Sequence, residues 1–240
     1  MLILCLALLF LAPEDLPKGE EVLARYVQVT GGRAAYQQVH GSIAKGTMAL
    51  TAQNVKGSMT VYEAEPMKQV TVVEFPGIGR IEEGTDGTIA WSSSALEGAR
   101  LKQGEEKAMA LRAANSQAKF LDWKKLFKSV ETLGLEDVDG KPCYKVLFTP
   151  LAGKPETEYY DKASGLLVKE MATVTMPMGE VAVSMTIGGY RQEGGILMPH
   201  SLQQNLAGQK IDITIESVAI NPEFPAKRFD APADVRALIK

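Results

Sequence analysis

The sequence predicts a mainly β protein with some helix (α+β), in which roughly nine to eleven antiparallel strands form one sheet curled around helices. Three observations predict it. Apolar and polar residues alternate with period two in several stretches between residues 40 and 221, turn residues separate these stretches, and the connections are too short for crossover helices. A sheet of that many strands has to curl, and all-β domains often reach this length as one unit.

The first residues differ from the rest of the chain. An apolar run from Leu2 to Phe10 extends to Ala12 and stops at Pro13. Such a run is too short to span a membrane but has the length of a signal-peptide core. We therefore expect residues 1–12 to be a signal peptide and residues 13–240 to form a single exported, periplasmic domain. The alternative is a buried N-terminal helix or strand.

The next elements follow from periodicity and turn residues. Val22, Leu23 and Tyr26 recur at helical spacing, which predicts a helix from Pro17 that ends at Gly31-Gly32. One or two further helical turns are expected over residues 33–39. The period then changes to two, most clearly over residues 55–62, 181–187 and 211–216. The predicted turns are Asp86-Gly87, Asp139-Gly140, Asp161 to Gly165, Gly194-Gly195 and Ala207-Gly208.

Two segments interrupt or close this β pattern. Gly104 to Lys128 has apolar residues without strict alternation, so we expect a helix that caps or plugs the curl. Pro232 to Lys240 is expected to form a short closing helix.

Composition and charge exclude several functions. The net charge of −3 comes from 26 basic and 29 acidic residues mixed along the chain, so nucleic acid is not an expected partner. With two histidines, His40 and His200, and two cysteines, Cys5 and Cys143, the chain is poor in zinc ligands. Glycine-rich nucleotide-binding motifs are missing. We predict no cofactor, no catalytic metal and no enzyme activity.

Other polar groups have plain interpretations. The two histidines are expected to be structural or exposed, and a hydrolase that uses one of them is the least favoured hypothesis. Ser92-Ser93-Ser94 is interpreted as a turn after a strand. Glu82 and Glu83 are expected to point to opposite faces of a strand, as part of a solvated run of charges.

The candidate site is an apolar cavity on the concave side of the sheet. Methionine is frequent in the strands, and its flexible side chain suits a surface that accepts ligands of variable shape. The alternative is that methionine fills an irregular core. The residues predicted to line a lipid cavity are Met59, Val61, Val183, Met185, Ile187, Ile211 and Ile213.

A set of turn and packing residues extends over nearly the whole chain after residue 12. They are Tyr26, Gly31-Gly32, Ala35, Gly46, Asp86-Gly87 with Trp91, Tyr159-Tyr160-Asp161 with Gly165-Leu166, Gly189-Tyr190, Pro199, Asn221, and Phe229 with Pro232. In order and spacing this set resembles a known group, the outer-membrane lipoprotein-sorting proteins of the LolA/LolB-like superfamily. The resemblance implies a half-open antiparallel β-barrel curled around helices, with a cavity that shelters lipid or the acyl chains of lipoproteins. In that family a basic residue before a proline holds the cavity lid closed, whereas this chain has Glu65 before Pro66.

These inferences leave two functional hypotheses. The first is a non-enzymatic periplasmic carrier that binds lipid or acylated protein and is peripheral to membranes at most. The second is an exported interaction or accessory module, for example a partner of an envelope zinc peptidase, whose barrel is filled by its own side chains.

Overall fold

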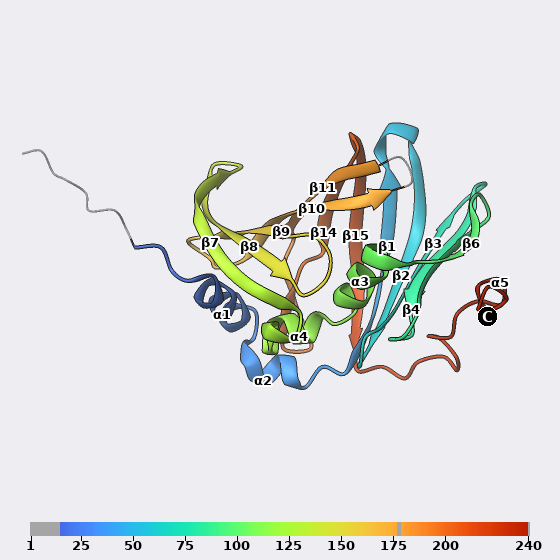
Figure 1. Cartoon of the computed structure of the whole chain (residues 1–240), viewed down its shortest axis with the longest axis horizontal. Coiled ribbons are helices and arrows are strands. Elements are labelled where there is room, and N and C mark those ends of the chain that lie inside the picture. The colour runs from blue at the N-terminus through green and yellow to red at the C-terminus, as the bar shows by residue number, and fades with distance from the viewer. Residues whose placement is uncertain (1–14, 177–178, 240) are drawn as a thin grey trace, which may run out of the picture.

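The computed structural model describes residues 15–176 and 179–239 (Figure 1). The predicted signal peptide, residues 1–12, lies outside the described residues and stays a prediction. In the described part, thirteen strands join in one antiparallel sheet, in the order β6-β5-β4-β3-β2-β1-β15-β14-β11-β10-β9-β8-β7. Their bounds are β1 Gly41–Leu50, β2 Val55–Ala64, β3 Lys68–Phe75, β4 Gly79–Thr85, β5 Ala90–Ser94, β6 Gly98–Leu101, β7 Phe127–Val138, β8 Lys141–Pro150, β9 Glu156–Asp161, β10 Leu167–Met176, β11 Gly179–Gly188, β14 Ser201–Leu206 and β15 Gln209–Ile220.

The remaining elements are short. A two-stranded sheet pairs β12, Arg191–Glu193, with β13, Ile196–Met198. Two 3-10 turns cover Thr51–Gln53 and Trp123–Lys125. The α-helices of the described part are α1 Gly19–Val29, α2 Gly32–Gln37, α3 Gly104–Ala113, α4 Ser116–Leu121 and α5 Ala233–Arg236.

The chain path explains where the helices lie. From β1 in the middle of the sheet the chain runs outward to β6, crosses to β7 at the opposite edge, and returns to β15 beside β1. Helices α3 and α4 form the crossing, and Figure 1 shows α3 between the two halves of the sheet. Since β6 and β7 do not pair, the sheet is curled but open rather than closed into a barrel.

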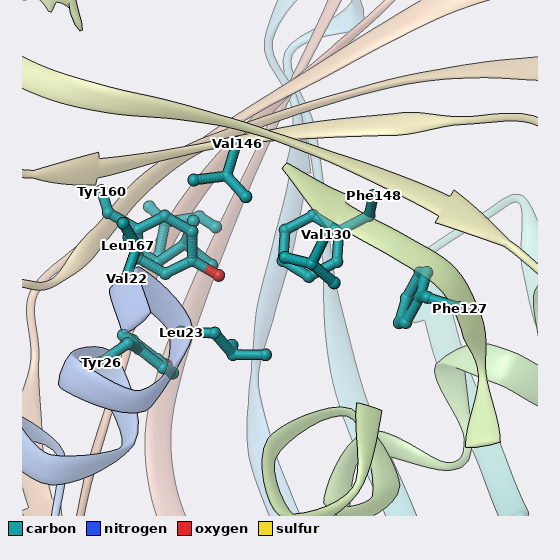
Figure 2. Packing of buried hydrophobic residues seen from close by; sticks show 10 residues of the cluster. Val22, Leu23, Tyr26, Phe127, Val130, Val146, Phe148, Tyr160 and Leu167 are labelled. Atoms are coloured by element: carbon teal, nitrogen blue, oxygen red, sulfur yellow. The ribbon is translucent and has the colours of Figure 1, made fainter. Parts of the chain in front are cut away.

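The two faces of the sheet are covered differently. We call the side of the sheet on which α1 and α4 pack the inner face. Residues directly opposite one another on neighbouring strands share a face, so the strand pairing tells which residues lie on the inner face. Val22, Leu23 and Tyr26 of α1 pack there against Val146 and Tyr160 of the strands, in the cluster that Figure 2 shows. On the opposite, outer face, the C-terminal segment covers β3 and β5 through a second cluster that contains Val70, Val72, Trp91, Ala231 and Val235.

The structure confirms a mainly β, antiparallel, curled fold and corrects some details. The described strands exceed the nine to eleven expected, because strands such as β6 are too short to show alternation. Helix is confirmed for most of Gly104 to Lys128 but not as one element: α3, α4 and a 3-10 turn occupy the segment, and β7 begins at Phe127. Phe127 is buried among the strand residues of the inner face, where a continuing helix would not place it.

Two interpretations of polar runs are also corrected. Ser92-Ser93-Ser94 lies within β5, not in a turn, because pairing with β4 and β6 satisfies its backbone. Glu82 is buried on the outer face by Arg80 and Arg228 rather than solvated. Glu83 instead pairs with Lys102 at 2.6 Å, so the expected opposite orientation of the two carboxylates is confirmed.

Gly46 gives a direct test of how closely β1 and β15 pack. It lies at a bulge in the β1–β15 pairing, and a Cβ at this position would collide with the backbone oxygen of Thr214. We expect Gly46→Ala to lower the free energy of unfolding by about 2 kcal/mol, as overpacking does. Gly188→Ala in β11 is the control, because a Cβ there meets no atom within 4 Å. Urea unfolding of both variants checks this, and equal losses would contradict the register.

Candidate ligand-binding face

All seven predicted lining residues lie on the inner face. Ile187 of β11 belongs to the cluster beneath α1 and therefore lies on the inner face. The residues paired with it in turn across β14, β15 and β1 share this face: Leu202, Ile213 and Met48. Val183 and Met185 share the face of Ile187, and Ile211 shares that of Ile213, because they are two or four residues apart on the same strands. In β2, Met59 and Val61 lie opposite Gly46 and Ala44 of β1. Their role in lipid binding stays a prediction.

Burial divides the seven residues into two groups. Met59 is 4% exposed and Ile187 is 7% exposed, so both serve as core. The other five are half-buried. Together with half-buried inner-face neighbours they form what we call the apolar band: Met48, Leu50, Val55, Val61, Val183, Met185, Ile211 and Ile213.

Part of the inner face is filled by the sheet itself. The hydrophobic cluster around Met59, Val73, Phe75 and Ile215 is built, among the described residues, from strand side chains. Phe75 is 5% exposed although no helix contributes to this cluster. The curl of β15, β1, β2, β3 and β4 therefore packs these side chains against one another. Five residues of the apolar band are partly buried against the same cluster: Met48, Leu50, Val55, Val61 and Ile213.

Helix α3 is attached to both halves of the sheet by polar contacts. Near its start, Glu106 accepts two hydrogen bonds from Arg100 of β6, at 2.7 and 2.5 Å. Near its end, Arg112 donates to Glu156 of β9 at 3.0 Å. In the described structure no residue of α3 is fully buried, and Met109 is exposed. Polar contacts thus hold α3 in place without a buried apolar face.

A group of charged residues lies on the inner face beneath α4, and we call it the ionic cluster: Arg112, Lys119, Glu156, Glu158 and Glu170. Lys119 contacts Glu158, which is 1% exposed and also accepts a hydrogen bond from Tyr160. Burial lowers the pKa of Lys119, but Glu158, Glu170 and Glu156 outweigh burial and raise it above its usual value. Lys119 therefore carries its charge inside the fold.

Glu170 is the exceptional member of the ionic cluster. It lies on β10, directly opposite Glu158 of β9 and Met185 of β11. It is half-buried, and no hydrogen bond or salt bridge joins it to another described residue. Burial, and then repulsion by Glu158 against attraction by Lys119, raises the pKa of the Glu170 carboxyl to about 7.

Sequence reasoning missed the ionic cluster. A signal for it was present: Glu156, Glu158 and Tyr160 alternate in one strand, which places three polar groups on one face. The partners Lys119 and Arg112 come from the helical crossing, and residue spacing does not reveal that contact.

The histidines have structural partners. His200 is 2% exposed, with Nδ1 at 2.9 Å from the Ile215 carbonyl oxygen and Nε2 at 3.1 Å from Glu193. His40 Nδ1 lies 3.0 Å from Glu65, the acidic residue before Pro66. A cavity of about 50 Å³ adjoins His40, and another of about 100 Å³ lies beside Arg25, but neither is lined by a predicted cavity residue.

The described part of the chain holds neither a group of candidate metal ligands nor a helix that could span a membrane. In residues 15–176 and 179–239, His, Cys, Asp and Glu side chains do not gather in a group of three or more that could hold a metal ion. No helix within those same residues is long and apolar enough to cross a membrane.

The ionic cluster predicts a large effect from removing one cation. We expect Lys119→Met to lower the free energy of unfolding by about 3 kcal/mol, because it leaves the Glu158 carboxylate buried without its partner. Lys125→Met is the control, since Lys125 is exposed and pairs with Asp122 at 3.5 Å, and we expect a loss under about 0.5 kcal/mol. Chemical denaturation measures both, and similar losses would argue against a buried ion pair.

Glu170 predicts a pH dependence of stability. Its folded pKa of about 7 lies above the ordinary 4.5, so between these values the folded state binds more protons than the unfolded state. The free energy of unfolding should therefore fall by on the order of 2 kcal/mol as pH rises through this window. The loss is complete once pH exceeds the folded pKa. Glu170→Gln should lack this component. Unfolding measured across the window in both proteins tests it, and parallel pH profiles would refute the assignment.

No protein-family model and no curated protein matches the sequence. Solved structures match in fold. An outer membrane lipoprotein-sorting protein domain from Vibrio parahaemolyticus has a TM-score of 0.60 at 16% identity, with 88% of this chain and 97% of that chain covered. A DUF1329 family protein from Desulfovibrio piger has a TM-score of 0.58 at 15% identity, covering 88% and 95%.

A LolA superfamily protein from Nitrosomonas europaea also has a TM-score of 0.58, at 10% identity, covering 90% of this chain and 99% of that chain. These matches extend over most of each chain, in keeping with the resemblance carried by the turn and packing residues. The chain therefore has the fold of the LolA-superfamily and outer-membrane lipoprotein-sorting domain proteins.

Proposed function

We propose that the protein is a non-enzymatic periplasmic carrier that binds acyl chains of lipids or lipoproteins along the apolar band. The supporting observation is that half-buried apolar side chains from β1, β2, β11 and β15 share one concave face. Water hydrates such a face poorly, and an acyl chain would cover it. The fold shared with lipoprotein-sorting proteins supports the same function.

The energetics are adequate for reversible binding. Burying one methylene contributes about 0.8 kcal/mol, so a ten-carbon chain gains up to about 8 kcal/mol before several are lost to immobilisation. The expected affinity is on the order of micromolar. Helix α3 is attached through pairs such as Arg100–Glu106, in which the arginine side chain is 48% exposed. Exposed pairs contribute about 0–1 kcal/mol each, so the start of α3 is held weakly, whereas the largely buried Arg112–Glu156 pair anchors its end.

Export completes the proposal. The apolar run in residues 1–12 is proposed to direct the chain across the inner membrane and to be removed, which leaves residues 13–240 as one domain.

The prediction is tested by placing a charge on the apolar band. We expect Val183→Asp to lower the affinity for dodecanol at least about tenfold, because a carboxylate would lie where the acyl chain packs. The affinity is measured by displacement of a neutral fluorescent apolar probe. Met171→Asp is the matched control, because Met171 lies on the adjacent strand, is 38% exposed and contacts Tyr159 on the outer face. Equal weakening by both variants, or no binding by the wild type, would contradict the carrier function.

A second function is favoured by one observation. The self-packed cluster around Met59, Val73, Phe75 and Ile215 fills part of the curl with the chain's own side chains. Most of the apolar band already packs against this cluster. If such packing also covers the rest of the band in solution, the protein is an interaction or accessory module without a lipid ligand. Failure of the wild type to bind any acyl compound would favour this function.

A further inference from the structure

The ionic cluster carries an unequal number of charges. Its described members comprise three carboxylates, from Glu156, Glu158 and Glu170, and two cations, from Arg112 and Lys119. Both cations are engaged: Arg112 with Glu156 at 3.0 Å and the Ala152 carbonyl oxygen at 3.1 Å, and Lys119 with Glu158. One negative charge is therefore left without a matched cation when all three carboxylates are ionised.

The position of Glu170 makes it the carboxylate that carries the excess. Glu158 is enclosed by Lys119 and Tyr160, and Glu156 is held by Arg112. Glu170 is half-buried and has Met185 of the apolar band directly opposite it on the next strand. An acyl chain lying along Val183 and Met185 would bring its polar end close to this carboxylate.

On these grounds, and resting on the proposed carrier function, we propose that Glu170 is a specificity-determining residue that selects acyl ligands with an ammonium polar end over ligands with a carboxylate end. An ammonium supplies the missing positive charge and forms a charge-assisted hydrogen bond in a partly desolvated site. A carboxylate would instead face Glu170, Glu158 and Glu156, and like charges at close range repel.

The neighbouring titratable groups leave this balance unchanged near neutral pH. The tyrosines in contact with the cluster, Tyr26 of α1, Tyr160 of β9 and Tyr190 after β11, all have pKa values raised by burial and remain neutral. The charged groups that act on Glu170 are Glu158 and Glu156 from β9 and Lys119 from α4. Arg112 from α3 is engaged with Glu156. Protonation of Glu170 itself removes the excess charge, so the selectivity should weaken in acid.

The experiment compares three ligands that share one dodecyl chain: dodecylammonium, dodecanol and dodecanoate, each below its micelle concentration. Displacement of the neutral fluorescent probe from the full domain at about pH 8, where Glu170 is ionised, gives their relative affinities. We expect dodecylammonium to bind at least about tenfold more tightly than dodecanoate, with dodecanol between them.

Two variants and a change of pH locate the effect. Glu170→Gln preserves side-chain shape and should bring the ammonium-to-carboxylate ratio to within about threefold. Glu136→Gln removes the same charge from an exposed residue that pairs with Lys145 on β8, and should keep the wild-type ratio. Lowering the pH to about 6 should reduce the ammonium-to-dodecanol ratio in the wild type, because Glu170 becomes protonated while the ammonium stays charged.

The outcomes separate the two proposals. Equal affinities for the three ligands, or an unchanged ratio in Glu170→Gln, overturn the role of Glu170 and leave the carrier function in place. Failure of the wild type to bind any of the three overturns both.

Discussion

The connection between the two edge strands is the constraint on which the rest of the structure depends. The chain leaves the sheet at Leu101 of β6 and re-enters at Phe127 of β7, so residues 102–126 must cross from one edge to the other. The crossing lies on the inner face. It therefore covers the cluster beneath α4 and brings Lys119 and Arg112 against β9. It also places α3 between the two halves of the sheet (Figure 1). A different route would leave Glu158 buried without a cation.

The crossing also explains why one inner face contains two different environments. Beneath α1 and α4, side chains such as Phe148 and Val146 are fully buried. Toward β11, β15 and β1 the cover is thinner, and Val183 and Ile211 stay half-buried. Glu170 lies at the boundary of these environments. A ligand with an apolar chain and a polar end matches this succession of surfaces, which is the physical basis of the proposed carrier function.

The fold was predictable where a pattern is local. Alternation in β2, β11 and β15 and turn pairs such as Asp139-Gly140 predicted antiparallel strands, because side-chain direction repeats every two residues. Burial was less predictable: Met59 and Val61 have the same alternation, but the curl of the sheet encloses one and leaves the other half-exposed. The ionic cluster depends on contacts such as Lys119–Glu158, between residues 39 positions apart. No periodicity encodes such a contact.

The claim that an acyl chain lies along the apolar band is tested most directly by methyl NMR with a nitroxide-labelled acyl chain. The account predicts that the nitroxide on the bound acyl chain broadens the methyl signals of Val183, Ile211 and Ile213. The methyls of Val70 and Val72 should keep their intensity, because the C-terminal segment covers them on the outer face. Uniform broadening, or broadening confined to the outer face, would contradict the account.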